Sequence, residues 1–199
     1  ALAHHDAAII LAPSLAWAWY NRANALRDLG RHHDAVASLD QAIELRPDDA
    51  LAWYDRGNAL LDLDRADEAV ASYDRAIALR ADYVEAYFNL GIALQGQGRL
   101  DDALVNFQRG LALKPDYARG YALLGGAHFD LGQFDLAQAA LSKALERDPD
   151  TALALALVPS LRKMSLDDDA WLQKALRLRA QAAAVLSKDA DTLRFAVGK

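Results

Sequence analysis

The segment from Ala50 to Tyr83, ALAWYDRGNALLDLDRADEAVASYDRAIALRADY, decides the fold, because its pattern recurs along the chain with a period of 34 residues. Its second half places Ala69, Tyr73 and Ala76 at spacings of four and three, which puts them on one face of a helix. Its first half shows a second apolar pattern of helical length. The segment therefore predicts two consecutive helices, and its recurrence predicts an array of such pairs.

A proline column precedes each predicted pair. It comprises Pro13, Pro47, Pro115 and Pro149, with Ala81 in the remaining position. The next column carries side chains that accept hydrogen bonds from the free N–H groups of a helix's first turn. We therefore predict that the first helices of the pairs start near Ser14, Asp48, Asp82, Asp116 and Asp150.

Two further columns describe the first helix of each pair. The aromatic column comprises Trp19, Trp53, Tyr87 and Tyr121. The small-residue column comprises Ala23, Gly57, Gly91 and Gly125. The small residues predict that two helices approach most closely there. A column that tolerates left-handed dihedral angles then ends the helix, at Gly30, Asp64, Gly98 and Gly132.

The second helix of each pair shows one small and apolar face. Its three columns are Ala35, Ala69, Ala103 and Ala137, then Leu39, Tyr73, Phe107 and Leu141, then Ala42, Ala76, Gly110 and Ala144. The columns together resemble the tetratricopeptide repeat family. This resemblance implies an all-α fold, a right-handed α-solenoid of antiparallel helix pairs. Four whole repeats are predicted, over residues 16–49, 50–83, 84–117 and 118–151, and residues 1–15 are predicted to be the second helix of a truncated repeat.

The chain departs from the pattern after residue 151. Pro159 falls in the small-residue column, inside a predicted helix, where it removes a backbone donor and predicts a kink or break near Val158. Residues 152–188 are predicted to form a degenerate helical pair, with a helix from Ala170 to Leu186. Residues 189–199 are predicted to start a further helix. Because the chain opens at Ala1 inside a helical pattern, we expect it to be a fragment of a longer protein.

Composition excludes several classes of partner. The 199 residues carry a net charge of -6 with scattered acidic residues, so we expect no nucleic-acid partner. No apolar stretch approaches the roughly 20 residues that span a bilayer, so we expect no membrane partner. Cysteine is absent, which removes thiol chemistry and disulfides. We predict a cytoplasmic location.

Chemical motifs predict no active site. The strings His4-His5-Asp6 and His32-His33-Asp34 contain good metal ligands, yet a site needs three or four that converge, and ordinary turn residues explain the second string. The run from Gly91 to Gly98 lacks the lysine of a phosphate-binding loop, and no serine lies in a G-x-S-x-G turn. We therefore expect no catalytic residue, no cofactor and no metal.

In the family that this sequence resembles, the first helices line a concave surface. On that assignment, the predicted peptide-binding residues are Trp17, Tyr20, Asn21, Asn24, Tyr54, Asp55, Asn58, Phe88, Asn89 and Ile92. Tyr20, Tyr54 and Phe88 are aromatic at positions that the packing pattern does not require, which favours an interface. The charged residues at all the inward-facing positions are five acids and two bases: Asp28, Asp55, Asp62, Glu85, Asp130, Arg27 and Arg119. The predicted ligand is therefore extended and neutral to basic.

This surface resembles one specialised member of the family and differs from another. Asn21 and Asn89 share a column, with Asp55 between them, which resembles the asparagine ladder of the repeat domain of protein O-GlcNAc transferases. That resemblance implies amides that bind a peptide backbone, although Leu123 interrupts the ladder in the fourth repeat. The carboxylate clamp of chaperone-binding members needs lysine and arginine where this sequence has residues such as Tyr20 and Asp55. Chaperone tails are therefore not expected as partners.

The main hypothesis is a non-catalytic scaffold that binds an extended peptide or a protein surface in a concave groove. An alternative is an accessory substrate-recruiting or regulatory arm of a larger bacterial transferase, because Leu193 to Lys199 and the preceding Arg-rich helix resemble the repeat arm of proteins with a sulfotransferase or glycosyltransferase domain. A third hypothesis is self-association through uncapped repeat ends, since terminal repeats without a polar cap leave apolar faces open.

Overall fold

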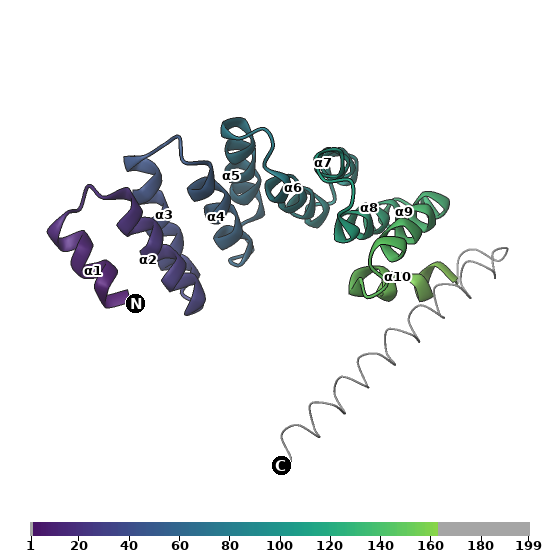
Figure 1. Ribbon diagram of the computed structural model, residues 1–199, viewed down its shortest axis with the longest axis horizontal. Coiled ribbons are helices and arrows are strands. Elements are labelled where there is room, and N and C mark those ends of the chain that lie inside the picture. The colour runs from purple at the N-terminus through teal and green to yellow at the C-terminus, as the bar shows by residue number, and fades with distance from the viewer. Residues whose placement is uncertain (1, 163–199) are drawn as a thin grey trace, which may run out of the picture. The chain divides into compact units, whose positions relative to one another are not determined.

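Helices account for all the regular secondary structure that is described. The computed structural model describes residues 2–162, and this part of the chain contains no strand. Figure 1 shows the helices in chain order. They are α1 (Leu2–Leu11), α2 (Ala16–Asp28), α3 (His32–Leu45), α4 (Ala50–Leu61), α5 (Ala66–Leu79), α6 (Val84–Gly96), α7 (Leu100–Leu113), α8 (Ala118–Asp130), α9 (Phe134–Arg147) and α10 (Ala152–Arg162).

The described helices belong to two compact units, with α1 to α7 in the first and α8 to α10 in the second. Within the first unit each helix packs against the next one in the chain. The pairs α2–α3, α4–α5 and α6–α7 have the most extensive contacts, and α3–α4 and α5–α6 join one pair to the next. This stack of helix pairs is the all-α solenoid arrangement that the sequence predicts.

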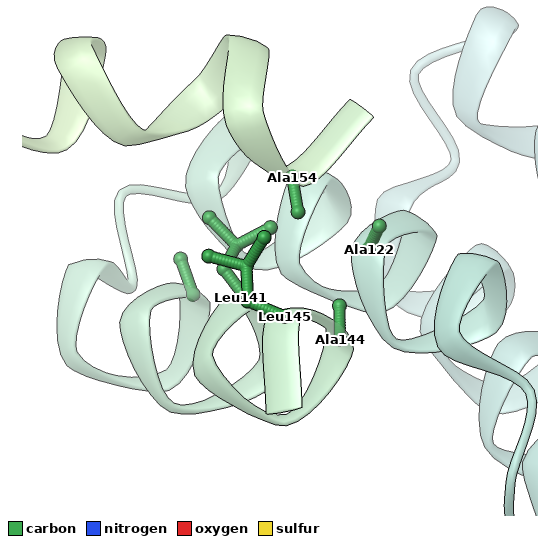
Figure 2. Close-up of a cluster of buried hydrophobic side chains, with 6 residues drawn as sticks. Ala122, Leu141, Ala144, Leu145 and Ala154 are labelled. Carbon is green, nitrogen blue, oxygen red and sulfur yellow. The ribbon is translucent and has the colours of Figure 1, made fainter. Parts of the chain in front are cut away.

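The second unit is organised around one apolar cluster. α8 pairs with α9, and α10 packs on both. Figure 2 shows Ala122 of α8, Leu141 and Leu145 of α9 and Ala154 of α10 gathered between these helices. Leu141 and Ala154 are completely buried. Burial of a leucine side chain contributes about 1.5–3 kcal/mol, so this cluster is a main source of the unit's stability.

The first helices of the pairs begin two residues later than predicted, at Ala16, Ala50, Val84, Ala118 and Ala152. The predicted capping residues lie instead in a turn. In one such turn the N–H of Asp49 donates to the carbonyl of Arg46 at 3.3 Å, with Pro47 and Asp48 between them. Proline favours the second position of a turn because its φ is fixed. The capping side chain of α4 is Asp49, which accepts from the N–H groups of Leu51 and Ala52.

The ends of the first helices are as predicted. The φ angles of Gly30, Asp64, Gly98 and Gly132 are 72°, 59°, 75° and 72°. After α2 the N–H of Arg31 donates to the carbonyl of Leu26, five residues earlier, at 2.9 Å. This is the wider-spanning of the two hydrogen bonds in a Schellman motif. The resulting tight turn lets the second helix return against the first.

The predicted close approach of two helices occurs at the small-residue column. A Cβ atom on Gly57 would lie 2.5 Å from Cε1 of Tyr73, and one on Gly91 would lie 2.6 Å from Cδ1 of Phe107. Both rings are completely buried. Each ring of a second helix therefore packs directly on the backbone of the first helix.

Hydrogen bonds also connect the aromatic column to the proline column. The indole Nε1 of Trp19 donates to the carbonyl of Pro13 at 2.8 Å, and that of Trp53 donates to the carbonyl of Pro47 at 3.0 Å. The column pattern does not reveal these bonds. They fix the turns before α2 and α4 to the helices that follow them.

The prediction for the end of the array is partly outside the described residues. α10 continues from Ala152 to Arg162 and includes Pro159, so the predicted break near Val158 is wrong. A bend at this residue stays a prediction. The helix predicted from Ala170 to Leu186 and the segment 189–199 lie outside the described residues.

Candidate functional site

The predicted peptide-binding residues lie on α2, α4 and α6, all within the first unit. Several of their polar members are joined by hydrogen bonds that pass from helix to helix, together with Arg27 of α2 and Tyr73 of α5. We call this set the polar network; it consists of Tyr20, Arg27, Tyr54, Asp55, Asn58, Tyr73 and Asn89.

Asp55 is the centre of the contact between α2 and α4. Its carboxylate is buried, with 6% of the residue exposed. Oδ2 accepts from the hydroxyl of Tyr20 at 2.6 Å, and Oδ1 pairs with Nη1 of Arg27 at 3.0 Å. A buried carboxylate requires such partners because it has lost its hydration. The charge of Asp55 is thus balanced within the protein, and the residue joins two consecutive first helices.

Asn58 and Asn89 form the contact between α4 and α6. Nδ2 of Asn89 donates to Oδ1 of Asn58 at 2.8 Å and to the hydroxyl of Tyr54 at 3.0 Å. The hydroxyl of Tyr73, from α5, donates to the same oxygen of Asn58 at 2.8 Å. The ring of Tyr54 also packs against that of Tyr83, with 4.8 Å between centroids. Of the two amides in the predicted ladder, that of Asn89 therefore binds groups of the protein itself, Asn58 and Tyr54.

The titration behaviour of the network follows from burial and from Asp55. Burial raises the pKa of Tyr20 to about 12, and the hydrogen bond and charge of Asp55 act in the same direction. Burial also raises the pKa of Tyr54 and of Tyr73. Burial alone would lower the pKa of Arg27, but the hydrogen bond and charge of Asp55 raise it overall. The tyrosine hydroxyls therefore remain protonated donors at neutral pH.

Raising the pH above 10 is expected to lower the free energy of unfolding. Tyrosines of the unfolded chain ionise near pH 10, whereas Tyr20 in the folded protein ionises with a pKa of about 12. Between these values the unfolded state binds fewer protons, so stability falls as pH rises. Urea unfolding at several pH values, followed by circular dichroism, measures the slope. Tyr20→Phe should reduce this slope, and an unchanged slope would show that Tyr20 does not contribute to it.

The aromatic residues of the predicted site differ in exposure. Trp17 is 51% exposed, but Phe88 is 4% exposed and stacks on Phe107 with 6.4 Å between ring centroids. The expectation that Phe88 presents its ring at the surface is therefore wrong. The physical reason is Gly110 of α7, where a Cβ atom would lie 2.8 Å from Cζ of Phe88. Because Gly110 has no side chain, α7 leaves space for this ring.

The accessible part of the face lies toward the start of the first helices. Trp17 and Leu51 occupy equivalent positions of α2 and α4, with 51% and 43% exposed, and Glu85 is exposed at the same position of α6. Asn21 is half-buried and has no hydrogen-bond partner in the described part of the chain. Leu51 was not among the predicted binding residues, although the 34-residue column through Trp17 points to it. We call Trp17, Asn21, Leu51 and Glu85 the first-helix surface.

Asn24 and Ile92 complete the predicted set, and both are half-buried. Asn24 hydrogen-bonds with Tyr20, which places it beside the polar network. Ile92 lies on α6, one helical turn after Asn89. Neither residue is as accessible as Trp17, Leu51 or Glu85.

Residues 2–162 show neither a metal site nor a membrane-spanning helix. No group of three or more histidine, aspartate or glutamate side chains in that part is arranged to hold a metal ion. Nδ1 of His32 lies 3.1 Å from Oδ2 of Asp62. Over the same residues, the helices are too short or too polar to cross a bilayer.

Comparisons with solved structures identify similar folds. The crystal structure of MamA has a TM-score of 0.73 and 28% sequence identity, covering 76% of this chain and 88% of that one. The structure of YrrB, described as a TPR protein with an unusual peptide-binding site, has a TM-score of 0.71 and 28% identity, covering 78% and 80%. MamA 41-end from Desulfovibrio magneticus RS-1 is 23% identical over 83% of this chain and 96% of that one, with a TM-score of 0.75, and shows the fold alone.

Family models agree with these structures. One model of the tetratricopeptide repeat matches residues 20–84 and 57–118, and a second matches residues 94–159. No curated protein matches the sequence significantly. The two models together match residues 20–159, where the structure shows paired helices with buried alanine columns. This chain belongs to the tetratricopeptide repeat family.

Proposed function

We propose that this chain is a non-catalytic scaffold that binds an extended polypeptide segment along the first helices α2, α4 and α6. The observation that carries the proposal is the exposure of Trp17 and Leu51, 51% and 43%, at equivalent positions of consecutive repeats. Large apolar side chains repeated on one face favour an interface. The peptide-binding site named for YrrB, a similar structure, supports the same class of partner.

The polar network prepares this surface for binding. Asp55, Asn58 and Asn89 already hydrogen-bond with neighbouring helices, so they hold α2, α4 and α6 in one arrangement before a ligand arrives. A preorganised surface loses less conformational entropy on binding. The direct contacts then come from the first-helix surface. Asn21 suits a peptide backbone because its amide offers a donor and an acceptor together.

The charge preference of the ligand comes from residues other than Asp55. That carboxylate is balanced by Arg27 at 3.0 Å, so it adds little attraction for a bound cation. Glu85 is exposed in the same column as Trp17 and Leu51. A neutral to basic segment with an apolar residue for each of Trp17 and Leu51 fits this surface. Complementary charge here would raise the association rate more than the affinity.

Simultaneous replacement of Trp17 and Asn21 by alanine is expected to weaken peptide binding by at least about tenfold, which corresponds to about 1.4 kcal/mol. Peptides would be selected from a random library against the wild-type chain, and their dissociation constants measured by calorimetry. Leu45→Ala is the matched control, because Leu45 is also exposed (39%) but lies at the end of a second helix, α3. Equal losses in the two variants, or tight binding by the double variant, would contradict the proposed surface.

The other hypotheses rest on different residues. The transferase-arm hypothesis depends on Leu193 to Lys199 and the helix before them, which lie outside the described residues. Self-association through repeat ends and the cytoplasmic location stay predictions. Light scattering over a concentration series would test the first of these.

A further inference from the structure

A three-residue arrangement links consecutive second helices in the first unit. Its members are an aspartate, an arginine 16 residues later and a serine 16 residues after that. In the first case Nε of Arg22 donates to Oδ1 of Asp6 at 2.7 Å, and Nη1 donates to Oγ of Ser38 at 2.7 Å. The guanidinium of a first helix, α2, thus lies between two second-helix positions, on α1 and α3.

The same arrangement recurs one repeat later. Nε of Arg56 donates to Oδ1 of Asp40 at 2.6 Å, and Nη1 donates to Oγ of Ser72 at 2.8 Å. The serine hydroxyl itself donates to the carbonyl of Glu68, four residues earlier, at 2.8 Å. The hydroxyl oxygen is therefore left as an acceptor for the guanidinium. Two repeats with matching distances show that this fold builds a guanidinium site between neighbouring second helices.

The third repeat retains the acceptors but lacks the arginine. The corresponding residues are Asp74, Leu90 and Asn106. Nδ2 of Asn106 donates to the carbonyl of Asp102 at 2.9 Å, just as the serines bond four residues back, so its Oδ1 takes the acceptor position of the hydroxyl. A cleft of about 280 Å³ is present at this place, and Asp74, Leu90, Leu94 and Asn106 are among its lining residues.

The charged groups around the cleft leave Asp74 without a close partner. Arg99 pairs with Asp102 at 2.6 Å. Arg109 also lines the cleft but makes no ion pair with Asp74. In the described part of the chain Asp74 has no hydrogen bond or ion pair, and the charge of Arg99 acts on it from farther away. Burial raises the pKa of Asp74, and the charge of Arg99 opposes this effect.

We propose that the cleft formed by Asp74, Leu90 and Asn106 binds the guanidinium of an arginine side chain from a partner polypeptide. That group would occupy the place that Arg22 and Arg56 fill in the two preceding repeats. A planar guanidinium can reach a carboxylate and an amide oxygen at once, which a lysine ammonium does less well. The cleft lies among α5, α6 and α7 and involves none of the residues of the first-helix surface. This inference therefore goes beyond the proposed function and stands on separate residues.

The test uses three short peptides that differ in one side chain. Acetyl-Gly-Arg-Gly-amide and its citrulline and lysine counterparts would be titrated into the ¹⁵N-labelled chain and followed by NMR. The arginine peptide is expected to shift the signals of Asp74, Leu90 and the Asn106 side-chain amide, and the citrulline peptide is not. Asp74→Asn should raise the dissociation constant of the arginine peptide by about tenfold or more, since it removes a charged hydrogen-bond acceptor. Asp40→Asn is the matched control, because Arg56 already occupies that site, and it should leave this constant unchanged.

Three results would overturn the proposal. They are equal shifts with both peptides, unchanged binding by Asp74→Asn, and binding of a lysine peptide as tight as that of the arginine peptide. Leu90→Arg supplies the guanidinium from within the chain and should abolish binding; should this variant fail to fold, Asp74→Asn still decides the question. The double variant Trp17→Ala/Asn21→Ala should still bind the arginine peptide. The experiment therefore distinguishes failure of the proposed arginine site from failure of the proposed first-helix surface.

Discussion

Replacing Gly91 with alanine is expected to lower the free energy of unfolding by about 1–3 kcal/mol. In a helix interior the same change ordinarily stabilises by about 1 kcal/mol, so the expected sign is the reverse of the usual one. The reason is that a Cβ atom on Gly91 would lie 2.6 Å from Cδ1 of Phe107, whose ring is completely buried. Urea unfolding followed by circular dichroism measures the change.

Gly96 provides a control in the same helix, α6. A Cβ atom there would meet no atom within 4 Å. Gly96→Ala is therefore expected to leave stability unchanged or to raise it slightly. Gly91→Ala behaving like Gly96→Ala would show that the ring of Phe107 does not pack on the backbone as described.

A compensating change tests the contact more directly. The first repeat has Ala23 and Leu39 in the columns of Gly91 and Phe107, and both are buried. Phe107→Leu should therefore make room for an alanine at position 91. The double variant is expected to lose less unfolding free energy than the sum of the two single losses, because the effects of substitutions at residues in contact do not add.

The helix pairs were predictable because each repeat expresses the same local chemistry. Gly30 and Asp64 tolerate positive φ, and they end their helices with φ of 72° and 59°. The starts of the first helices were less predictable. Asp48 carries an acceptor that suits both a helix cap and a turn, and the preceding Pro47 favours the turn, so the helix begins at Ala50.

The candidate site was less predictable because it depends on contacts between repeats. The exposure of Phe88 depends on Gly110, a residue of the next helix that leaves space for the ring. Whether the carboxylate of Asp55 is free or paired depends on Tyr20 and Arg27 from the preceding repeat. The position of a residue in its 34-residue column does not specify such partners. The ion pairs of Arg22 and Arg56 could have been predicted from the sequence. Each arginine follows an aspartate, Asp6 or Asp40, by 16 residues, and this spacing recurs with the repeat.

Asp55→Ala is expected to lower the free energy of unfolding by about 2–3 kcal/mol, less than the roughly 3–5 kcal/mol for breaking a fully buried pair. The expected loss is smaller than that value because the side chain of Arg27 is 32% exposed and can be solvated after the change. The side chain of Asp55 is only 8% exposed. The variant would leave the hydroxyl of Tyr20 without its 2.6 Å acceptor. Urea unfolding measures the loss, and wild-type stability would show that the polar network does not join α2 to α4.

The next repeat suggests how to restore the contact without charge. The positions of Arg27 and Asp55 are filled one repeat later by Leu61 and Asn89. The double variant Arg27→Leu/Asp55→Asn copies that pair, so it should recover most of the stability that Asp55→Ala loses. It also separates two roles for Asp55 in peptide binding. A direct charge contact would make the double variant lose affinity for basic peptides, and the affinity would depend less on salt. Because Asp55 is buried against Arg27, we expect the double variant to bind basic and neutral peptides as the wild type does, and Asp55→Ala to weaken both equally.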